Sequence, residues 1–225
     1  MTATFEDKYS AEYLDRIDGS LYSSVLSDIL DEAGHPHQVM RPNVRPLYPG
    51  AKVAGRAATM LAIAVSVLPE QPYRLLMEHL DGIRPGEVVV AGVQGGVQAA
   101  LWGELLSTHT RGRGGRGAVL DGFSRDSWGI EHMRFPVFAT GVSPADSKGR
   151  LEVITIRQPI LAGGVAVADG DLVLADEDGV VVVPAALEDE VVGKAFDKVA
   201  GENTVREILR RGASIREVFE EHGLL

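Results

Sequence analysis

The chain has 225 residues, a formal net charge of −10 at pH 7 and no cysteine. A chain of this length can bury a substantial core, and we expect one domain over residues 1–225. The absence of cysteine excludes disulfides, thiolate nucleophiles and Cys-ligated zinc, so any metal must be held by oxygen or imidazole. The acidic balance argues against nucleic acid as a partner, because binding to a phosphate backbone needs a basic surface.

The N-terminal sequence is polar and acidic, whereas a secretory signal has a basic start and then an apolar run. The longest nearly uncharged stretch covers residues 57–68. It cannot span a bilayer, which needs roughly twenty apolar residues. We therefore expect a cytoplasmic protein with no membrane segment, and we expect residues 57–68 to form a buried strand.

The first two-thirds of the chain alternate between predicted helices and strands. Apolar residues at helical spacing predict helices, and short β-branched runs predict strands covered on both faces. Ser23 and Ser24 are the expected cap of the first helix. In chain order the predictions are a helix over 23–33, one or two strands over 53–67, a helix over 70–80, a strand over 87–91, a helix over 97–108, a strand over 118–120, a helix over 127–133 and a strand over 135–139. This order favours a parallel core with right-handed crossovers.

From residue 151 the pattern changes to short strands. They are predicted over 151–156, 164–167, 171–175 and 179–184, with Asp-Gly turns at 169–170 and 178–179. These strands indicate a compact β layer or partial barrel. The region 186–225 is predicted to be helical, and Ser214 to Glu217 form a capping-box sequence for the last helix. We expect these helices to lie across a neighbouring subunit.

Two carboxylates and a guanidinium border one turn-rich stretch, because Glu104 is followed after twenty residues by Arg125 and Asp126. Arg125 and Asp126 follow a predicted strand, and ligands of open α/β sheets gather at the carboxyl ends of strands. Asp126 offers one hard oxygen ligand to Mg²⁺ or Mn²⁺, which keeps several waters. Arg125 offers a planar fork for a carboxylate. The alternative for this pair is a salt bridge or helix cap that stabilises a turn.

Glu104 lies in an apolar part of the predicted helix 97–108. Burial there is expected to raise the pKa of its carboxyl toward the range in which it can act as a general acid or base. A position on a solvated helix face is the alternative. The glycines at 92, 95 and 96 precede this helix and allow backbone amides to approach a ligand, although their spacing is not a dinucleotide fingerprint. For these glycines the alternative is a tight structural turn.

Residues 111–116, Arg-Gly-Arg-Gly-Gly-Arg, resemble an RNA-binding segment. One copy without aromatic residues in an acidic chain favours a surface loop instead. The six histidines show no paired metal-ligand spacing, and there is no Gly-x-Ser-x-Gly elbow. These absences exclude a zinc hydrolase and a serine hydrolase as the function of the chain.

Several motifs in a fixed order resemble the family of 4-hydroxy-4-methyl-2-oxoglutarate aldolases, 4-carboxy-4-hydroxy-2-oxoadipate aldolases and RraA-type regulators of ribonuclease E. The resemblance covers about residues 20–212 and rests on the stretches 26–30, 45–50, 54–56, 85–88, 102–106, 121–126, 136–139 and 179–184. It implies an α/β fold of the RraA-like swivelling β/β/α type, with a mixed sheet or partial barrel and C-terminal helices. It also implies a homotrimer or homohexamer with active sites at subunit interfaces.

The resemblance implies a role for each candidate site residue. Asp126 would be the ligand of Mg²⁺ or Mn²⁺, with no organic cofactor, and Arg125 would face the substrate oxygens. The backbone of Gly103, Glu104, Leu105 and Leu106 would bind the carboxylate of pyruvate. Glu202 is the candidate for the glutamate that the adjacent subunit contributes in the aldolases.

The activity that the resemblance implies is cleavage of a 4-hydroxy-2-oxo acid to pyruvate by a class II, metal-dependent aldolase, with oxaloacetate decarboxylation as a side activity. The aldolases have Asp-x20-Arg-Asp, whereas this chain has glutamate at the first position. RraA-type regulators have a similar fold but no carboxylate at this first position, so Glu104 favours an enzyme over a regulator. Non-catalytic regulation of ribonuclease E is the alternative.

Overall fold

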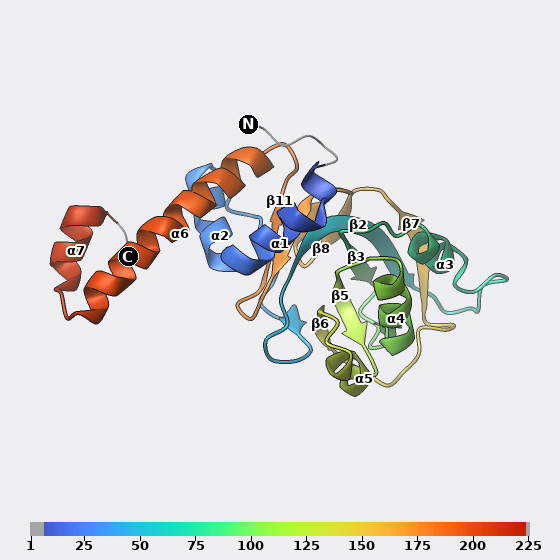
Figure 1. Ribbon diagram of the computed structural model, residues 1–225. Coiled ribbons are helices and arrows are strands. Elements are labelled where there is room, and N and C mark those ends of the chain that lie inside the picture. Colours follow the sequence, from blue (N-terminus) through green and yellow to red (C-terminus); the bar gives the residue numbers. More distant parts are fainter. Residues whose placement is uncertain (1–6, 224–225) are drawn as a thin grey trace.

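A computed structural model describes residues 7–223, so the two ends of the predicted domain, 1–6 and 224–225, lie outside the described residues. Within the described part, a nine-stranded, nearly closed mixed sheet is covered by helices on its outer faces (Figure 1). The helices are α1 (Ala11–Ser20), α2 (Ser23–Glu32), α3 (Arg74–Asp81), α4 (Glu104–Gly112), α5 (Ser127–His132), α6 (Glu188–Arg210) and α7 (Ile215–His222), preceded by a 3-10 turn η1 (Asp7–Tyr9). The α/β class and the partial barrel predicted from the sequence are confirmed.

Nine of the eleven strands form one continuous sheet with a parallel centre. They are β1 (Arg45–Pro46), β2 (Val53–Ala64), β3 (Glu87–Gln94), β4 (Ala100–Trp102), β5 (Gly117–Ser124), β6 (Val137–Val142), β7 (Leu151–Ile156), β8 (Ile160–Ala162), β9 (Val165–Val167), β10 (Leu172–Ala175) and β11 (Val180–Val183). The order is β1-β6-β5-β3-β2-β10-β11, with β4 beside β5, β7 beside β2, and β8-β9 as a separate hairpin. The pairs β2-β3, β3-β5 and β5-β6 are parallel, as the predicted βαβαβ order requires.

The central strands are buried on both faces. Residues 88–91 of β3 and 118–120 of β5 have no exposed surface, which suits the β-branched and small side chains found there. A second apolar cluster joins β10 and β11 to α1, α2 and the first half of α6, where Val191, Val192 and Ala195 are buried. These apolar side chains recur at helical spacing, so one face of the first half of α6 packs on the sheet and on α1 and α2.

The predicted helix 97–108 is wrong at its N-terminal end. Residues 100–102 form strand β4, which pairs with β5, and the helix begins only at Glu104. The apolar side chains of Leu101 and Trp102 are buried by sheet and helix together, a tertiary arrangement that helical spacing alone cannot distinguish. The strand predicted over 57–68 also ends early, at Ala64, because the next residues turn outward and leave Val67 76% exposed.

The two predicted helix caps differ from the observed ends. Helix α2 begins at Ser23, and the carboxylate of Asp176 accepts hydrogen bonds from the Ser23 amide at 2.7 Å and its hydroxyl at 2.6 Å. The carboxylate of Asp176 therefore accepts the hydrogen bonds that the first residue of this helix donates, although Asp176 is far away in the sequence. Ser214 is the N-cap of α7, but its side chain makes no capping hydrogen bond, so the predicted capping box is absent. Helix α1 was not predicted.

A buried ion pair fixes the start of α6 against the sheet. Arg56 of β2 donates two hydrogen bonds of 2.5 Å to Glu188, and neither side chain is more than 2% exposed. The Tyr13 hydroxyl donates a further hydrogen bond to Glu188 at 2.8 Å. Hydrogen bonds to both partners make such a buried pair tolerable, because isolated buried charge is very costly.

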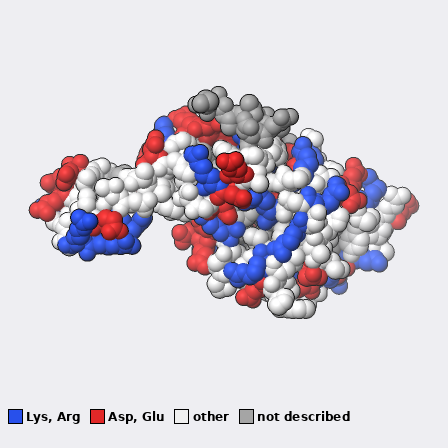
Figure 2. Space-filling view, in the orientation of Figure 1, with Lys and Arg blue, Asp and Glu red and all other residues white. Residues whose placement is uncertain are grey.

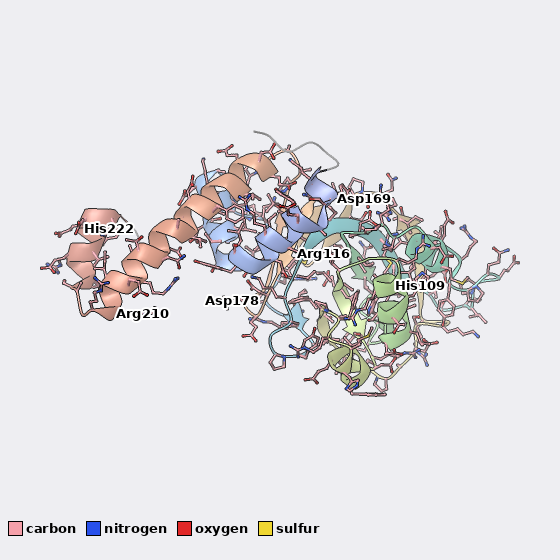
Figure 3. The ribbon with its side chains drawn as sticks, in the orientation of Figure 1. His109, Arg116, Asp169, Asp178, Arg210 and His222 are labelled. Atoms are coloured by element: carbon pink, nitrogen blue, oxygen red, sulfur yellow. The ribbon has the colours of Figure 1, made fainter. Side chains whose placement is uncertain are left out.

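The second half of α6 and all of α7 project away from the sheet (Figure 1). Arg210 and His222 mark this end of the molecule in Figure 3, far from His109 on α4. Basic and acidic side chains lie side by side on the face shown in Figure 2, from the sheet to the C-terminal helices. Among residues 7–223, no helix is both long enough and apolar enough to cross a membrane.

Candidate active site

A pocket of about 280 Å³ lies between α3 and α4, where β4 and β5 end. Its lining comes from α3, β4, the start of α4, the residues after β5 and the segment after β6. The lining residues are Tyr73, Leu76, Met77, Leu80, Ala100, Leu101, Trp102, Gly103, Leu105, Leu106, Arg125, Asp126, Asp146 and Ser147. The structure thus brings Arg125 and Asp126 together with Gly103, Leu105 and Leu106, all of which were candidates from the sequence.

Asp126 has a left-handed backbone, with φ 56° and ψ 35°, at the N-cap position of α5. Its side chain does not cap that helix. Instead, Oδ2 lies 3.4 Å from the backbone nitrogen of Glu104 and 3.6 Å from Nε of Arg125. An uncommon backbone conformation that aims a carboxylate into a pocket is typical of functional sites.

Gly103 allows this close approach. A Cβ built on Gly103 would lie 2.7 Å from Oδ2 of Asp126 and 3.3 Å from Cγ of Arg125. The backbone of Gly103 is extended, with φ −164°, so the need for glycine is steric and not conformational. The residue before α4 therefore forms a cradle for the carboxylate of Asp126.

The start of α4 provides backbone donors at the same place. Gly103 is the N-cap, and its carbonyl accepts the first helical hydrogen bond, from the Ser107 amide at 3.1 Å. The amides of Glu104, Leu105 and Leu106 belong to the first turn, where N–H groups have no acceptor within the helix. Together with the helix dipole, such amides favour a bound carboxylate or other anion.

Arg125 is held by two carboxylates. Its Nη1 lies 3.2 Å from Oδ1 of Asp146, in addition to the contact between Nε and Asp126. The Tyr73 hydroxyl donates to Oδ2 of Asp146 at 2.9 Å. Burial acts to raise the pKa of Asp146, but the Tyr73 hydrogen bond, backbone amides and Arg125 outweigh it, so the pKa lies below its usual value. Asp146 therefore stays ionised and orients the guanidinium.

Asp146 and Tyr73 were missed by sequence reasoning. Asp146 reaches the site because it forms an isolated parallel bridge with Ala100 of β4, which was itself predicted to be helical. Tyr73 has a left-handed backbone, with φ 66°, at the N-cap of α3. No motif or spacing in the chain signals either residue.

The carboxylate of Glu104 turns away from the pocket. Its Oε1 accepts a hydrogen bond of 2.8 Å from the Thr108 hydroxyl on the next turn of α4, and its stem packs on Gly129 of α5. The Glu104 side chain is only partly buried, which corrects the burial expected from the sequence. The reason is that the helix starts at Glu104 itself, so its first turn is not covered on that side. A catalytic role for Glu104 stays a prediction.

Glu202 lies on α6, on the other side of the molecule from α4 and α5 (Figure 1). Its carboxylate accepts a hydrogen bond from the Tyr22 hydroxyl and lies 3.8 Å from Nη2 of Arg206. One chain alone therefore does not bring Glu202 to the pocket. Its assignment to the site of an adjacent subunit stays a prediction.

The glycines at 92, 95 and 96 do not line the pocket. They lead into β4 and not into a helix, and a Cβ on Gly95 would lie 2.4 Å from that of Ala64. Gly92 and Gly95 therefore let neighbouring segments approach, whereas a Cβ on Gly96 would meet nothing within 4 Å and Gly96 instead has a left-handed backbone with φ 67°. Arg111 and Arg116 likewise have structural partners: Arg111 lies over the Phe135 ring at 5.4 Å and Arg116 pairs with Asp15 at 2.7 Å.

The donor set at the pocket fits Mg²⁺ or Mn²⁺ better than zinc. Within residues 7–223, no group of three or more His, Asp or Glu side chains could hold a metal. The carboxylate of Asp126 faces the pocket and is 43% exposed, which leaves room for water ligands. A hard cation that uses one or two protein carboxylates and keeps its waters suits this arrangement, whereas a closed tetrahedral zinc site does not.

A family model described as RraA-like, Aldolase/RraA, matches residues 23–182, which is more than half of the chain. The chain belongs to the RraA-like family. The match includes the residues of the pocket, from α3 to the segment after β6.

Two relatives and one solved structure show what this RraA-like chain is similar to. A protein of Halalkalibacterium halodurans named "Putative 4-hydroxy-4-methyl-2-oxoglutarate aldolase" is 30% identical over 178 residues, which cover 79% of this chain and 80% of that protein. Protein DlpA of Legionella pneumophila is 28% identical over 89% of this chain, but this chain spans only 32% of its length. The structure of Streptomyces coelicolor RraAS2, described as an unusual member of the RNase ES inhibitor RraA family, has a TM-score of 0.77 and 30% identity, and covers 88% of this chain and 96% of its own.

Proposed function

We propose that this RraA-like protein is a divalent-metal-dependent class II pyruvate aldolase that cleaves a 4-hydroxy-2-oxo acid of the 4-hydroxy-4-methyl-2-oxoglutarate type. The observation that carries the proposal is the meeting of the Asp126 carboxylate, the Arg125 guanidinium and the N-terminus of α4 at one pocket. The name of the H. halodurans relative supports the same reaction class.

Each group has a role that follows from its chemistry. The amides of Leu105 and Leu106 bind the carboxylate of the 2-oxo acid at the positive end of α4. Asp126 is the residue that would hold Mg²⁺ or Mn²⁺. When bound, the ion supplies a Lewis acid for the 2-oxo acid oxygens. Arg125, oriented by Asp146, stabilises the negative charge that develops on the keto oxygen during cleavage.

The reaction breaks the bond between C3 and C4 of the substrate. The 4-hydroxyl loses its proton to a base, C4 becomes a carbonyl, and the electron pair of the broken bond passes into the enolate of pyruvate, which is then protonated at C3. A water held by Glu104, or by a carboxylate of the adjacent subunit, is the proposed base. Oxaloacetate decarboxylation passes through the same enolate, so we expect it as a side activity.

The proposed assembly is a homotrimer or homohexamer in which Glu202 of one subunit contributes to the pocket of the next. Two features support it: the pocket opens beside exposed apolar side chains, Leu105 at 75% and Met77 at 56%, and α6 projects from the sheet. Exposed apolar surface of this kind is typical of a contact region.

Removal of the metal or of its ligand tests the proposal. We expect pyruvate release from 4-hydroxy-4-methyl-2-oxoglutarate and from oxaloacetate with Mg²⁺, loss of both activities in EDTA, and recovery when Mg²⁺ is added back. Asp126→Ala should lower kcat/KM by at least about 10²-fold, since it removes the ligand of the Lewis acid. The matched control is Asp178→Ala, an exposed turn residue outside the pocket (Figure 3). Turnover that survives EDTA and Asp126→Ala would sink the assignment.

The likeness to S. coelicolor RraAS2 favours a second candidate, a non-catalytic protein that binds and inhibits a ribonuclease of the RNase E type. Capture of such a ribonuclease by the wild-type protein, together with no pyruvate from a panel of 2-oxo acids with Mg²⁺, would select this function. Pyruvate release that depends on Asp126 would select the aldolase.

A further inference from the structure

A second pocket lies at the opposite end of the sheet from the candidate active site. It has a volume of about 290 Å³, similar to the 280 Å³ of the first pocket, and it opens where β2, β5 and β6 begin. The 8 residues of β5 separate the two pockets, which is roughly 25 Å at about 3.3 Å per residue. This basic pocket is lined by Asp18, Lys52, Val53, Arg111, Gly115, Arg116, Arg134, Phe135 and Pro136.

The lining of the basic pocket has the opposite charge from the chain as a whole. Four of the lining residues, all of which the structure describes, are Lys or Arg, and Asp18 is the one acidic member, although the chain carries a net charge of −10. Figure 2 shows basic side chains gathered beside α1, at the place where Figure 3 labels Arg116. Cations held this close together repel each other unless an anion lies between them, so the lining favours a negatively charged ligand.

Two of the arginines are positioned by aromatic rings and not by carboxylates. The Arg111 guanidinium lies over the Phe135 ring at 5.4 Å, and the Arg134 guanidinium lies over the Tyr48 ring at 4.6 Å. Neither arginine forms an ion pair among the residues that the structure describes. Stacking covers the face of a guanidinium but leaves the N–H donors at its edge unused, and this edge is the part that binds a phosphate group bidentately.

Lys52 and Arg116 complete the positive lining. Nζ of Lys52 donates to the backbone carbonyls of Asp18 and Leu21, so no carboxylate of the described chain pairs with its charge. Arg116 pairs with Asp15 at 2.7 Å, and the Asp15 side chain is largely exposed to solvent. The basic pocket therefore keeps an excess of positive charge that the neighbouring carboxylates do not balance.

The backbone of Arg134 indicates that its side chain has a role. Arg134 directly follows the C-cap of α5 and has a left-handed φ of 53°, a conformation that favours glycine at this position. Two other described residues with such a backbone, Tyr73 and Asp126, belong to the candidate active site. An arginine where glycine is preferred is typical of a position at which the side chain is needed.

We propose that the basic pocket binds a diphosphate group. Arg111 and Arg134 offer one guanidinium fork to each of two linked phosphoryl groups, and the other two cations add attraction. A nucleic acid fits less well, because the Phe135 and Tyr48 rings are only 1% and 4% exposed and leave no free face on which bases could stack. The proposal is independent of the aldolase function, since it concerns the other end of the sheet.

Titration with inorganic pyrophosphate tests the proposal. Isothermal titration calorimetry in EDTA keeps divalent metal out of the measurement. We expect pyrophosphate to bind at least about tenfold more tightly than orthophosphate or sulfate, because the second phosphoryl group adds a second charge-assisted contact. The affinity should fall as the salt concentration rises, as it does for any partly exposed charge pair.

Two variants with opposite effects assign the binding to the basic pocket. Arg134→Gly suits the left-handed backbone, so it should keep its melting temperature and lose about tenfold in pyrophosphate affinity, the loss of one charge-assisted contact. Asp18→Asn removes the negative charge from the lining and should raise the affinity about threefold or more. A gain in affinity cannot result from misfolding.

Two control variants exclude binding elsewhere. Arg113→Gln removes the same charge from the same loop, but Arg113 lies outside the lining and donates to the carbonyl of Asp81, so the affinity should stay as in the wild type. Arg125→Gln removes a cation from the candidate active site and should also leave the pyrophosphate affinity unchanged.

The outcomes separate this proposal from its alternatives and from the proposed function. Equal binding of pyrophosphate and orthophosphate overturns it, as does full affinity in Arg134→Gly. Equal losses in Arg113→Gln and Arg134→Gly would show a diffuse basic surface of the kind that RNA binds, and a loss in Arg125→Gln alone would place the anion in the candidate active site; both results overturn the proposal. Pyrophosphate binding that follows the expected pattern in a protein without aldolase activity supports the proposal and removes only the proposed function.

Discussion

At the scale of single residues, the site depends on one missing methyl group. Asp126 has a left-handed backbone, which costs an ordinary residue about 1 kcal/mol or more, and its Oδ2 would lie only 2.7 Å from a Cβ added at residue 103. Asp and Asn tolerate this backbone best, because their short polar side chains bond locally. The pair Gly103 and Asp126 therefore acts as a unit, although twenty-two residues separate them.

Gly103→Ala should damage activity without unfolding the protein. The added Cβ would meet Oδ2 of Asp126 at 2.7 Å, so the carboxylate must shift, and a shift of ~1 Å at a reacting group costs on the order of 10²-fold in kcat/KM. The matched control is Gly112→Ala at the other end of α4, where a Cβ meets nothing within 4 Å. Mg²⁺-dependent pyruvate release and far-UV circular dichroism are the measurements. Equal activity in both variants would contradict a tight carboxylate cradle.

At the scale of elements, α3 contributes the apolar wall of the pocket and also buries a histidine beneath it. His79 is 1% exposed, and neither ring nitrogen has a hydrogen-bond partner among the described residues. Burial, and next the positive charge of Arg157, lower the pKa of His79 to about 4. The helix therefore packs on the sheet with a neutral imidazole.

The free energy of unfolding should fall as the pH decreases from about 6.5 to 4. An unfolded histidine has a pKa near 6.5, so within this window the unfolded chain binds a proton that folded His79 does not. The contribution is fully present above about pH 6.5, and roughly 2 kcal/mol of it should be lost by pH 4.5. Urea denaturation at pH 7 and pH 4.5 measures the change.

His79→Leu is the control that isolates this histidine from carboxylates that also titrate on acidification, such as Glu87, whose pKa is lowered despite its burial because Arg157 and Arg84 bind it. The variant removes no hydrogen bond, so it should keep its stability at pH 7 and lose less between pH 7 and 4.5. If both proteins lose the same free energy, His79 is not the source.

At the scale of the whole molecule, the pocket and the projecting helices lie at opposite sides of one chain. The first half of α6 packs on α2 and on β10 and β11, whereas the residues of its second half, 199–210, are exposed or half-buried except for Val205. Helix α7 adds the exposed apolar side chains Ile215 and Phe219. This geometry suits an arm that reaches a neighbour, which is the arrangement that the family resemblance implies for Glu202.

Mixed oligomers test this arm. Asp126→Ala and Glu202→Ala should each be nearly inactive alone, but coexpression at equal levels should restore about a quarter of wild-type activity, because random assembly pairs an intact Asp126 with an intact Glu202 in that share of sites. Tyr22→Phe removes the hydrogen bond to Glu202 and keeps the carboxylate, so it should stay active. Coexpression without any recovery, or full activity of Glu202→Ala, would contradict a shared site.

The sequence determined the parallel core and the side chains at the end of β5. Runs such as Val88–Ala91 and Ala118–Leu120 are local signals, since a short run of β-branched and apolar residues with no polar face favours a strand covered on both sides. The position of Arg125 and Asp126 also follows from the sequence. Residues that directly follow a parallel strand lie at the carboxyl end of that strand, where ligands of open α/β sheets bind.

Only the tertiary structure decided the strand β4, the cap of α2 and the partners of Arg125. Residues 100–102 form a strand because β5 and Asp146 offer their backbone at that place, and Asp146 orients Arg125 because the same bridge brings it there. Asp176 similarly caps α2 from 153 residues away. Each of these contacts joins segments far apart in the chain, so the partners of these backbone and side-chain groups depend on which segments lie close together in the folded state and not on local propensity.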